Sequence, residues 1–138
     1  MSDKPANSDH QLAAEAGIRR TLARYCHTID DGDFAALAEC FAPDAELAAF
    51  GRTRSGREAV AALLAKAMPP ENRGTHLTCN TVISEVGGGG EATVTASALS
   101  DFAFIGRDGS IRTGRYTDEF VAIDGRWLIA SREIALGG

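Results

Sequence analysis

The sequence has few of the features that mark membrane, secreted or nucleic-acid-binding proteins. No apolar run is long enough to cross a bilayer, and the N-terminal MSDKPANSDH lacks the apolar segment of a signal peptide. The 14 Lys and Arg residues are outnumbered by 19 Asp and Glu, and the resulting net charge of -5 disfavours nucleic acid as a ligand. These absences predict a cytoplasmic protein with neither a membrane nor nucleic acid as its partner.

Cysteine and the common cofactor motifs are equally sparse. The three cysteines, Cys26, Cys40 and Cys79, are odd in number and show no CxxC or Cys/His spacing, which predicts reduced thiols rather than disulfides or metal ligands. There is no phosphate-binding loop, dinucleotide fingerprint or nucleophile elbow, and the GGGG stretch does not precede a helix. The sequence therefore predicts neither a metal ion nor a cofactor.

What is present suits one compact domain. A chain of 138 residues with 44% hydrophobic and 24% charged residues can form a single core. Residues 1–11 read as a short disordered lead, and residues 12–136 as the domain.

The first part of the domain has helical periodicity. Apolar side chains recur at three-to-four spacing from Ala13 to Asp31, and Gly32 is a typical helix end. Asp33 is a good N-cap for a second helix, Phe34 to Cys40, which Pro43 would stop.

A strand and a third helix are predicted next. Ala45 to Phe50 can form a short strand. Ser55 and Glu58 have the spacing of a capping box, which predicts a helix from about Gly56 to Met68.

From Thr75 onward the apolar period changes to two, which predicts strands. The predicted strands are Thr75–Val86, Glu91–Ile105, Arg112–Ile123 and Arg126–Ala135. The predicted turns are Gly87–Gly90, Arg107–Gly109 and the strong hairpin signal Asp124–Gly125. Helices followed by an antiparallel meander predict an α+β fold, with the helices packed on one face of a curved, mainly antiparallel sheet.

One face of the strand 91–105 carries alanines and a serine before it ends in Phe102 and Phe104. Small side chains on a concave face leave volume for an apolar pocket. Alternatively, bulky side chains of the second helix, such as Phe34, Leu37 and Phe41, fill that volume.

Three polar residues are the best candidates for chemistry. Asp30 lies at the edge of the apolar arc of the first helix, at its C-terminal end, where an acidic group is electrostatically unfavourable. His76 opens the first long strand, and a histidine that meets a carboxylate is a general acid–base device. Tyr25 lies on the apolar face and its hydroxyl would need a partner if buried. The alternative is that Tyr25 is a core residue and His76 a structural one.

The last two strands contain three further notable side chains, Arg115, Tyr116 and Arg132. Arg115 and Arg132 are predicted to be surface charges. Tyr116 shares a face with Gly114, Asp118 and Phe120 and could line a pocket.

Several segments together resemble the SnoaL-like branch of the nuclear transport factor two-like superfamily. They are YCHTIDDGDF at Tyr25–Phe34, FAPDA at Phe41–Ala45, GREAV at Gly56–Val60, THL at Thr75–Leu77 and IDGRW at Ile123–Trp127. The resemblance covers about residues 12–135. It implies a cone-shaped α+β barrel, also called cystatin-like, with a deep apolar cavity and a homodimeric state.

Within that superfamily, the pattern is most similar to scytalone dehydratase and bile-acid dehydratase. By this resemblance Tyr25, Asp30 and His76 are catalytic, and Phe50 stands where scytalone dehydratase has a cavity tyrosine. Together with the strand residues Phe102 and Tyr116, Phe50 is expected to bind substrate. Scytalone dehydratase has a second histidine on the next strand, where this sequence reads Thr95-Ala96-Ser97. The resemblance therefore does not imply that this protein acts on the substrate of scytalone dehydratase.

Two functions follow as hypotheses. The first is a cofactor-independent lyase (a dehydratase) or isomerase that acts on a small hydrophobic cyclic carbonyl compound by His/Asp acid–base chemistry. The second is a non-catalytic ligand-binding or assembly module of the same fold.

Overall fold

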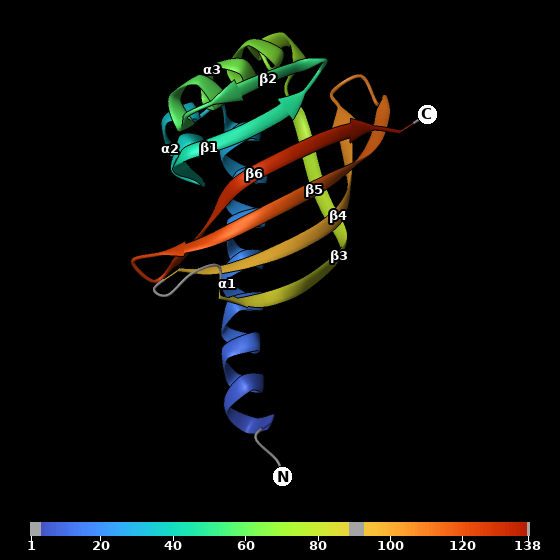
Figure 1. Ribbon diagram of the computed structural model, residues 1–138. Coiled ribbons are helices and arrows are strands. Elements are labelled where there is room, and N and C mark those ends of the chain that lie inside the picture. Colours follow the sequence, from blue (N-terminus) through green and yellow to red (C-terminus); the bar gives the residue numbers. More distant parts are fainter. Residues whose placement is uncertain (1–3, 89–92, 138) are drawn as a thin grey trace.

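The computed structural model describes residues 4–88 and 93–137 (Figure 1). The helices are α1 (Lys4–Asp31), α2 (Phe34–Ala38) and α3 (Arg57–Ala67), followed by a short 3-10 helix, η1 (Pro70–Asn72). The strands are β1 (Phe41–Ala49), β2 (Arg52–Ser55), β3 (Gly74–Gly88), β4 (Val94–Gly106), β5 (Ile111–Ile123) and β6 (Arg126–Leu136). The α+β fold predicted from the change of period is confirmed.

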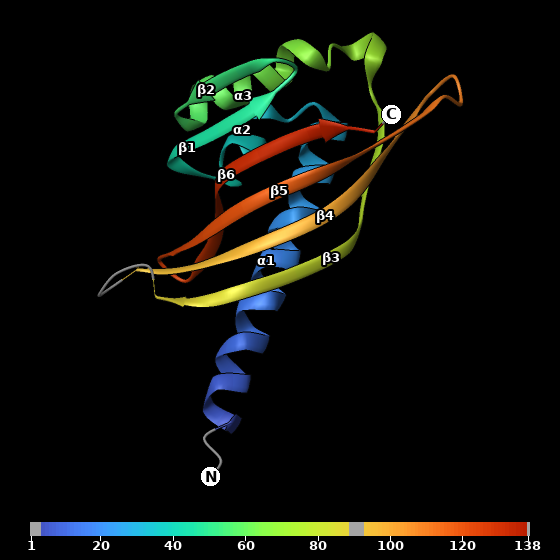
Figure 2. The ribbon, with the colours of Figure 1, turned by 45° about the vertical axis from the view of Figure 1, so that its right-hand side comes forward.

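The six strands form one sheet in the order β2-β1-β6-β5-β4-β3. All neighbouring pairs are antiparallel except β1 and β6, which are parallel. The long strands curve strongly, and α1 crosses their concave side while α3 covers the end formed by β1 and β2 (Figures 1 and 2). The helices thus lie on one face of the sheet.

The end of α1 is fixed by a Schellman turn. Gly32 has a φ of 73°, its N–H bonds to the carbonyl of Ile29 at 3.2 Å, and the N–H of Asp33 bonds to the carbonyl of Thr28 at 2.9 Å. Only glycine adopts this left-handed conformation without strain. Asp33 then caps α2, because its Oδ1 accepts the N–H of Ala36 at 3.1 Å. This turn fixes the end of α1 that carries Asp30.

The other end of α1 is longer than predicted. The helix begins at Lys4, so residues 4–11, predicted as a disordered lead, are helical. The side-chain amide of Gln11 donates to Glu15 at 3.2 Å, one turn along, which supports the helix locally. This end of α1 extends beyond the edge of the sheet (Figure 1).

The segment between the helices differs from prediction in two places. Pro43 lies inside β1 rather than before it, at a register shift between Phe41 and Glu46, where the missing N–H costs no regular ladder bond. The capping box is wrong, because the N-cap of α3 is Gly56 and no side chain caps it. Ser55 instead ends β2, a strand that the sequence did not predict.

The hairpin signal at Asp124–Gly125 is confirmed, since both residues have positive φ and Ile123 pairs with Arg126. Part of the predicted Gly87–Gly90 turn belongs to β3, which runs to Gly88. The rest lies outside the described residues.

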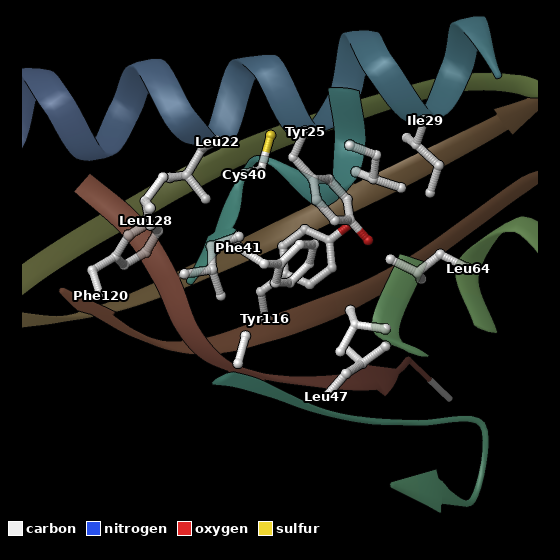
Figure 3. Close-up of a cluster of buried hydrophobic side chains, with 14 of the residues drawn as sticks. Leu22, Tyr25, Ile29, Cys40, Phe41, Leu47, Leu64, Tyr116, Phe120 and Leu128 are labelled. Atoms are coloured by element: carbon white, nitrogen blue, oxygen red, sulfur yellow. The ribbon is translucent and has the colours of Figure 1, made fainter. Parts of the chain in front are cut away.

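The core forms between α1 and the concave face of the sheet. The buried side chains labelled in Figure 3 come from α1, β1, α3, β5 and β6, and Cys40 lies just before β1. Ala96 and Ala98 of β4 are buried within this core, so the volume above the alanine face is filled by other side chains. The space left unfilled lies farther along β4, beside Phe102 and Phe104.

Cys26 and Cys40 are buried free thiols, and Cys79 is an exposed one. No helix in the described ranges is both long and apolar enough to cross a membrane.

Candidate functional site

Asp30 and His76, 46 positions apart in sequence, form a pair with two hydrogen bonds. Oδ1 of Asp30 lies 2.6 Å from the ring Nδ1 of His76, and Oδ2 accepts the backbone N–H of His76 at 2.9 Å. One carboxylate therefore fixes both the ring and the backbone at the start of β3. Because Nδ1 is engaged, Nε2 is the ring nitrogen available to a ligand.

The pair faces a cavity of about 450 Å³. Its side chains are largely shielded, with 9% of the His76 side chain and 17% of the Asp30 side chain exposed. The His76 ring rests on Phe104 with the ring centres 4.7 Å apart. The inner wall of the cavity is apolar or aromatic and consists of Ile29, Leu64, Met68, Phe102, Phe104 and Ile134, with Tyr25 and Tyr116 beside them.

Two tyrosines meet at the inner end of the cavity. The ring of Tyr25, from α1, packs edge-on against the ring of Tyr116, from β5, with centroids 5.9 Å apart. Tyr116 also stacks on Phe102 at 4.4 Å. Figure 3 shows the two tyrosines reaching toward each other from the helix and the sheet.

Arg132 lies between these two rings. Its Cζ is 4.4 Å from the ring centre of Tyr25 and 3.6 Å from that of Tyr116. Its Nε and Nη2 donate to the two carboxylate oxygens of Asp118, each at 2.8 Å. Nη1 is buried and has no hydrogen-bond partner among the described residues. The prediction that Arg132 is a surface charge is therefore wrong: its side chain is fully buried.

Burial and charge act in opposite directions on this group. Burial alone would lower the pKa of Arg132, but the Asp118 carboxylate raises it more, so the net pKa is raised. The guanidinium is thus a permanent cation beneath the tyrosine pair.

Both phenol pKa values are raised. For Tyr25 and Tyr116 the largest cause is desolvation by burial, which disfavours the phenolate. The Arg132 cation acts the other way and partly offsets it in both tyrosines. Each hydroxyl is therefore a neutral donor, lying beside a cation that would favour negative charge on a bound oxygen.

The structure brings together most of the residues singled out from the sequence. Tyr25, His76, Phe50, Phe102 and Tyr116 all line the cavity, with Phe50 about half exposed at its mouth. Asp30 adjoins it through His76. Arg115 is an exposed residue that bonds to Asp101 at 2.9 Å on the other face of the sheet.

Sequence reasoning missed the Asp118–Arg132 pair. A signal existed, because Asp118 shares the buried face of β5 with Tyr116 and Phe120, and a carboxylate on such a face requires a cationic partner. Within the described residues, no group of three His, Cys, Asp or Glu side chains could hold a metal ion.

The model of the SnoaL-like domain matches residues 10–133. The chain belongs to the SnoaL-like domain family. This confirms the resemblance to the nuclear transport factor two-like superfamily. A comparison with curated proteins gave no match.

Solved structures of SnoaL-like and related proteins share the fold over nearly the whole chain. Rv3472 from Mycobacterium tuberculosis, a protein of unknown function, is 28% identical, with a TM-score of 0.77 over 99% of this chain and 78% of that one. A nuclear transport factor two-like protein with a cystatin-like fold from Novosphingobium aromaticivorans is 26% identical, with a TM-score of 0.71 over 99% and 92% of the two chains.

A third solved structure of the same fold carries an enzyme name. It is a candidate scytalone dehydratase from Novosphingobium aromaticivorans, 24% identical, with a TM-score of 0.75 over 95% of this chain and 89% of that one. At this identity the likeness concerns the fold alone. Proteins that share this fold thus include one named as a dehydratase and another of unknown function.

Proposed function

We propose that the protein is a cofactor-independent lyase or isomerase that removes a proton next to the carbonyl group of a small hydrophobic, cyclic substrate. The observation that carries this proposal is the Asp30–His76 pair, with its 2.6 Å contact, beside a cavity whose inner wall is apolar or aromatic. A histidine oriented by a carboxylate is the usual arrangement of a general base.

In the proposed reaction, Nε2 of His76 takes the proton from the carbon next to the carbonyl, and the electron pair of the C–H bond moves to the carbonyl oxygen. Asp30 stabilises the resulting imidazolium and keeps the ring in position. The hydroxyl of Tyr25 donates to the developing enolate oxygen, and the Arg132 cation behind the ring favours the negative charge.

The second half of the reaction returns the same proton. When the substrate carries a hydroxyl on the neighbouring carbon, the imidazolium protonates that hydroxyl, which leaves as water while the enolate collapses to an unsaturated ketone. When the substrate instead carries a β,γ double bond, the enolate is a dienolate, the proton returns to its γ carbon, and the product is the conjugated isomer. The apolar residues Phe102 and Phe50 would bind the ring of the substrate.

Deuterium exchange in heavy water tests the first half without knowledge of the product. A panel of cyclic ketones and cyclic β-hydroxy ketones is incubated with the protein, and deuterium uptake and loss of water are followed by mass spectrometry. We expect His76→Ala to lower exchange by at least about a hundredfold, within the range for general-base catalysis. His27→Ala, which removes an exposed histidine of α1, is the matched control.

Full exchange by His76→Ala would refute the assignment of the base. Binding of the ketones to the cavity without any exchange would favour the alternative, a passive ligand-binding module.

We also propose that the protein is a homodimer that pairs through the outer face of the sheet. Leu77, Val82 and Leu99 are 49%, 62% and 42% exposed, and Val82 and Leu99 are direct cross-strand neighbours. Exposed apolar side chains that gather on one sheet face are typical of an interface.

A further inference from the structure

The mouth of the cavity differs in character from its inner wall. Three arginines line it, Arg73, Arg107 and Arg112, in a protein whose net charge is -5. Two carboxylates, Glu71 and Asp108, also lie there. In the described part of the chain none of the three arginines is within ion-pair distance of a carboxylate. The mouth therefore offers guanidinium groups that no protein acid neutralises directly.

One of the two acids is already engaged. Oδ1 of Asp108 accepts the backbone N–H of Ser110 at 2.9 Å within the hairpin between β4 and β5. This bond lowers the pKa of Asp108 and holds its carboxylate in the turn. The carboxylate stays charged, so the mouth carries three guanidinium groups against two carboxylates, an excess of one positive charge.

Register places Arg112 on the same face as the proposed base. His76 pairs with Phe104, and Phe104 pairs with Arg112, so the three residues form one row across β3, β4 and β5. Directly paired residues of adjacent strands point to the same face. Two strand spacings, about 10 Å, separate the backbones of His76 and Arg112.

Arg73 lies on another side of the mouth and is seated closely. Its Cζ is 5.9 Å from the ring centre of Phe34, and a Cβ on Gly32 would come within 2.4 Å of its guanidinium carbon. Its Nε is buried without a hydrogen-bond partner among the described residues. A half-buried guanidinium with an unsatisfied donor is suited to receive an acceptor from a ligand.

We propose that the mouth of the cavity binds an oxyanionic group of the substrate, a carboxylate or phosphate, through Arg112 and Arg73. The substrate would then be an amphipathic anion, with its charge about 10 Å from the carbon that His76 deprotonates. This proposal rests on the function proposed above for the inner end of the cavity. It adds the substrate class, because the anion at the mouth would direct the apolar body of the molecule inward.

A matched pair of fluorescent dyes tests the charge requirement. The probes are 8-anilinonaphthalene-1-sulfonate and N-phenyl-1-naphthylamine, which differ only by the sulfonate. We expect the anionic dye to bind at least about tenfold more tightly, and Arg112→Gln to raise its Kd about tenfold, as for loss of a charge-assisted hydrogen bond. The Kd of the neutral dye should stay within about twofold.

Arg115→Gln is the control, because it removes the same charge from the same strand on the opposite face. Arg73→Gln provides a second variant at the mouth. Displacement of the anionic dye by decanoate, decyl phosphate and decanol identifies the anion, and we expect decanol to be the weakest competitor.

Equal affinity for the two dyes, equal effects of Arg112→Gln and Arg115→Gln, or displacement by decanol as strong as by decanoate would overturn the proposal. These results leave the acid–base function standing, since it is tested separately by deuterium exchange. Conversely, full deuterium exchange by His76→Ala would refute the role of His76 as the base. The dye results would still show whether the mouth of the cavity binds an anion.

Discussion

Arg132 connects more of the site than any other residue described. Its guanidinium carbon lies 4.4 Å from the ring centre of Tyr25 and 3.6 Å from that of Tyr116, and its Nε and Nη2 donate to Asp118. A cation enclosed in this way is costly to bury, and the bidentate carboxylate offsets much of that cost. The position of both tyrosine rings therefore depends on a charge pair that does not itself line the cavity.

Removing one member of the Asp118–Arg132 pair should lower the stability of the protein more than removing both. Asp118→Asn leaves the Arg132 cation buried without its counter-charge, and we expect a loss of about 3–5 kcal/mol in the free energy of unfolding. The double variant Asp118→Leu/Arg132→Met should lose less than either single change. Urea unfolding followed by circular dichroism measures all three, and additive losses would contradict a coupled pair.

The raised phenol pKa values predict the alkaline behaviour of the protein. The chain contains two tyrosines, and both are buried with raised pKa. In the unfolded chain they ionise near the ordinary value of 10, so above that pH the folded state holds more protons than the unfolded state. Stability should then fall as pH rises from 10 toward the folded pKa values.

Tyrosinate absorbance measures this effect directly. We expect no tyrosinate at pH 10 in the folded protein. Above that pH, it should appear only together with loss of the circular dichroism of the folded state. Urea-unfolded protein provides the reference titration. A reversible tyrosinate signal near pH 10 in folded protein would show that at least one hydroxyl reaches solvent.

At the scale of the secondary-structure elements, α1 contacts the last hairpin at Gly17. This contact should reverse the usual effect of replacing a helical glycine by alanine. Alanine favours a helix over glycine by about 1 kcal/mol. At Gly17, however, an added Cβ would lie 2.6 Å from Cδ1 of Trp127. Gly17→Ala should therefore destabilise the protein by forcing α1 away from the indole.

In a Trp127→Leu background the obstacle is smaller, and the same Gly17→Ala change should become neutral or stabilising. Denaturant unfolding of the parent protein, the two single variants and the double variant measures the sign of the change in stability. Stabilisation by Gly17→Ala in the parent chain would show that the contact is not tight.

The elements also show how far the sequence could be read. The periodicity of α1 and of the long strands, the Gly32 end and the Asp124–Gly125 turn are local signals, and each was predictable. Helix α1 is longer than predicted because residues 4–11, KPANSDHQ, contain no large apolar residue that would mark a helix face in the sequence. Strand β2 was missed because its residues, Arg52–Ser55, are polar and mostly exposed.

The partner of Asp118 could not be found by counting from the hairpin turn. Regular pairing from Ile123 and Arg126 would place Asp118 opposite Ser131. A register shift between Glu119 and Phe120 moves the pairing by one residue and brings Arg132 opposite Asp118 instead. Asp30 and His76 were likewise named from the sequence, but their contact depends on how α1 crosses the sheet, which no local pattern specifies.

At the scale of the whole molecule, the proposed dimer should dissociate when a charged residue is introduced into its interface. Leu99→Lys places a charge among the exposed apolar residues of the outer sheet face and should shift sedimentation from dimer to monomer. Leu12→Lys, at a side chain that is 64% exposed on α1, is the control. A parent chain that sediments as a monomer would refute the dimer.

The place of β6 in the sheet has a consequence for the order of events during synthesis. This strand ends at Leu136, yet it lies between β1 and β5 and makes the one parallel pairing, with β1. Until it leaves the ribosome, β1, β2 and α3 have no sheet to join, and the buried sides of α1 and β5 lack Arg132. A growing chain must therefore keep apolar surface exposed until β6 has been made, and contacts between such distant segments form slowly. The nascent protein should depend on chaperones far more than its small size suggests.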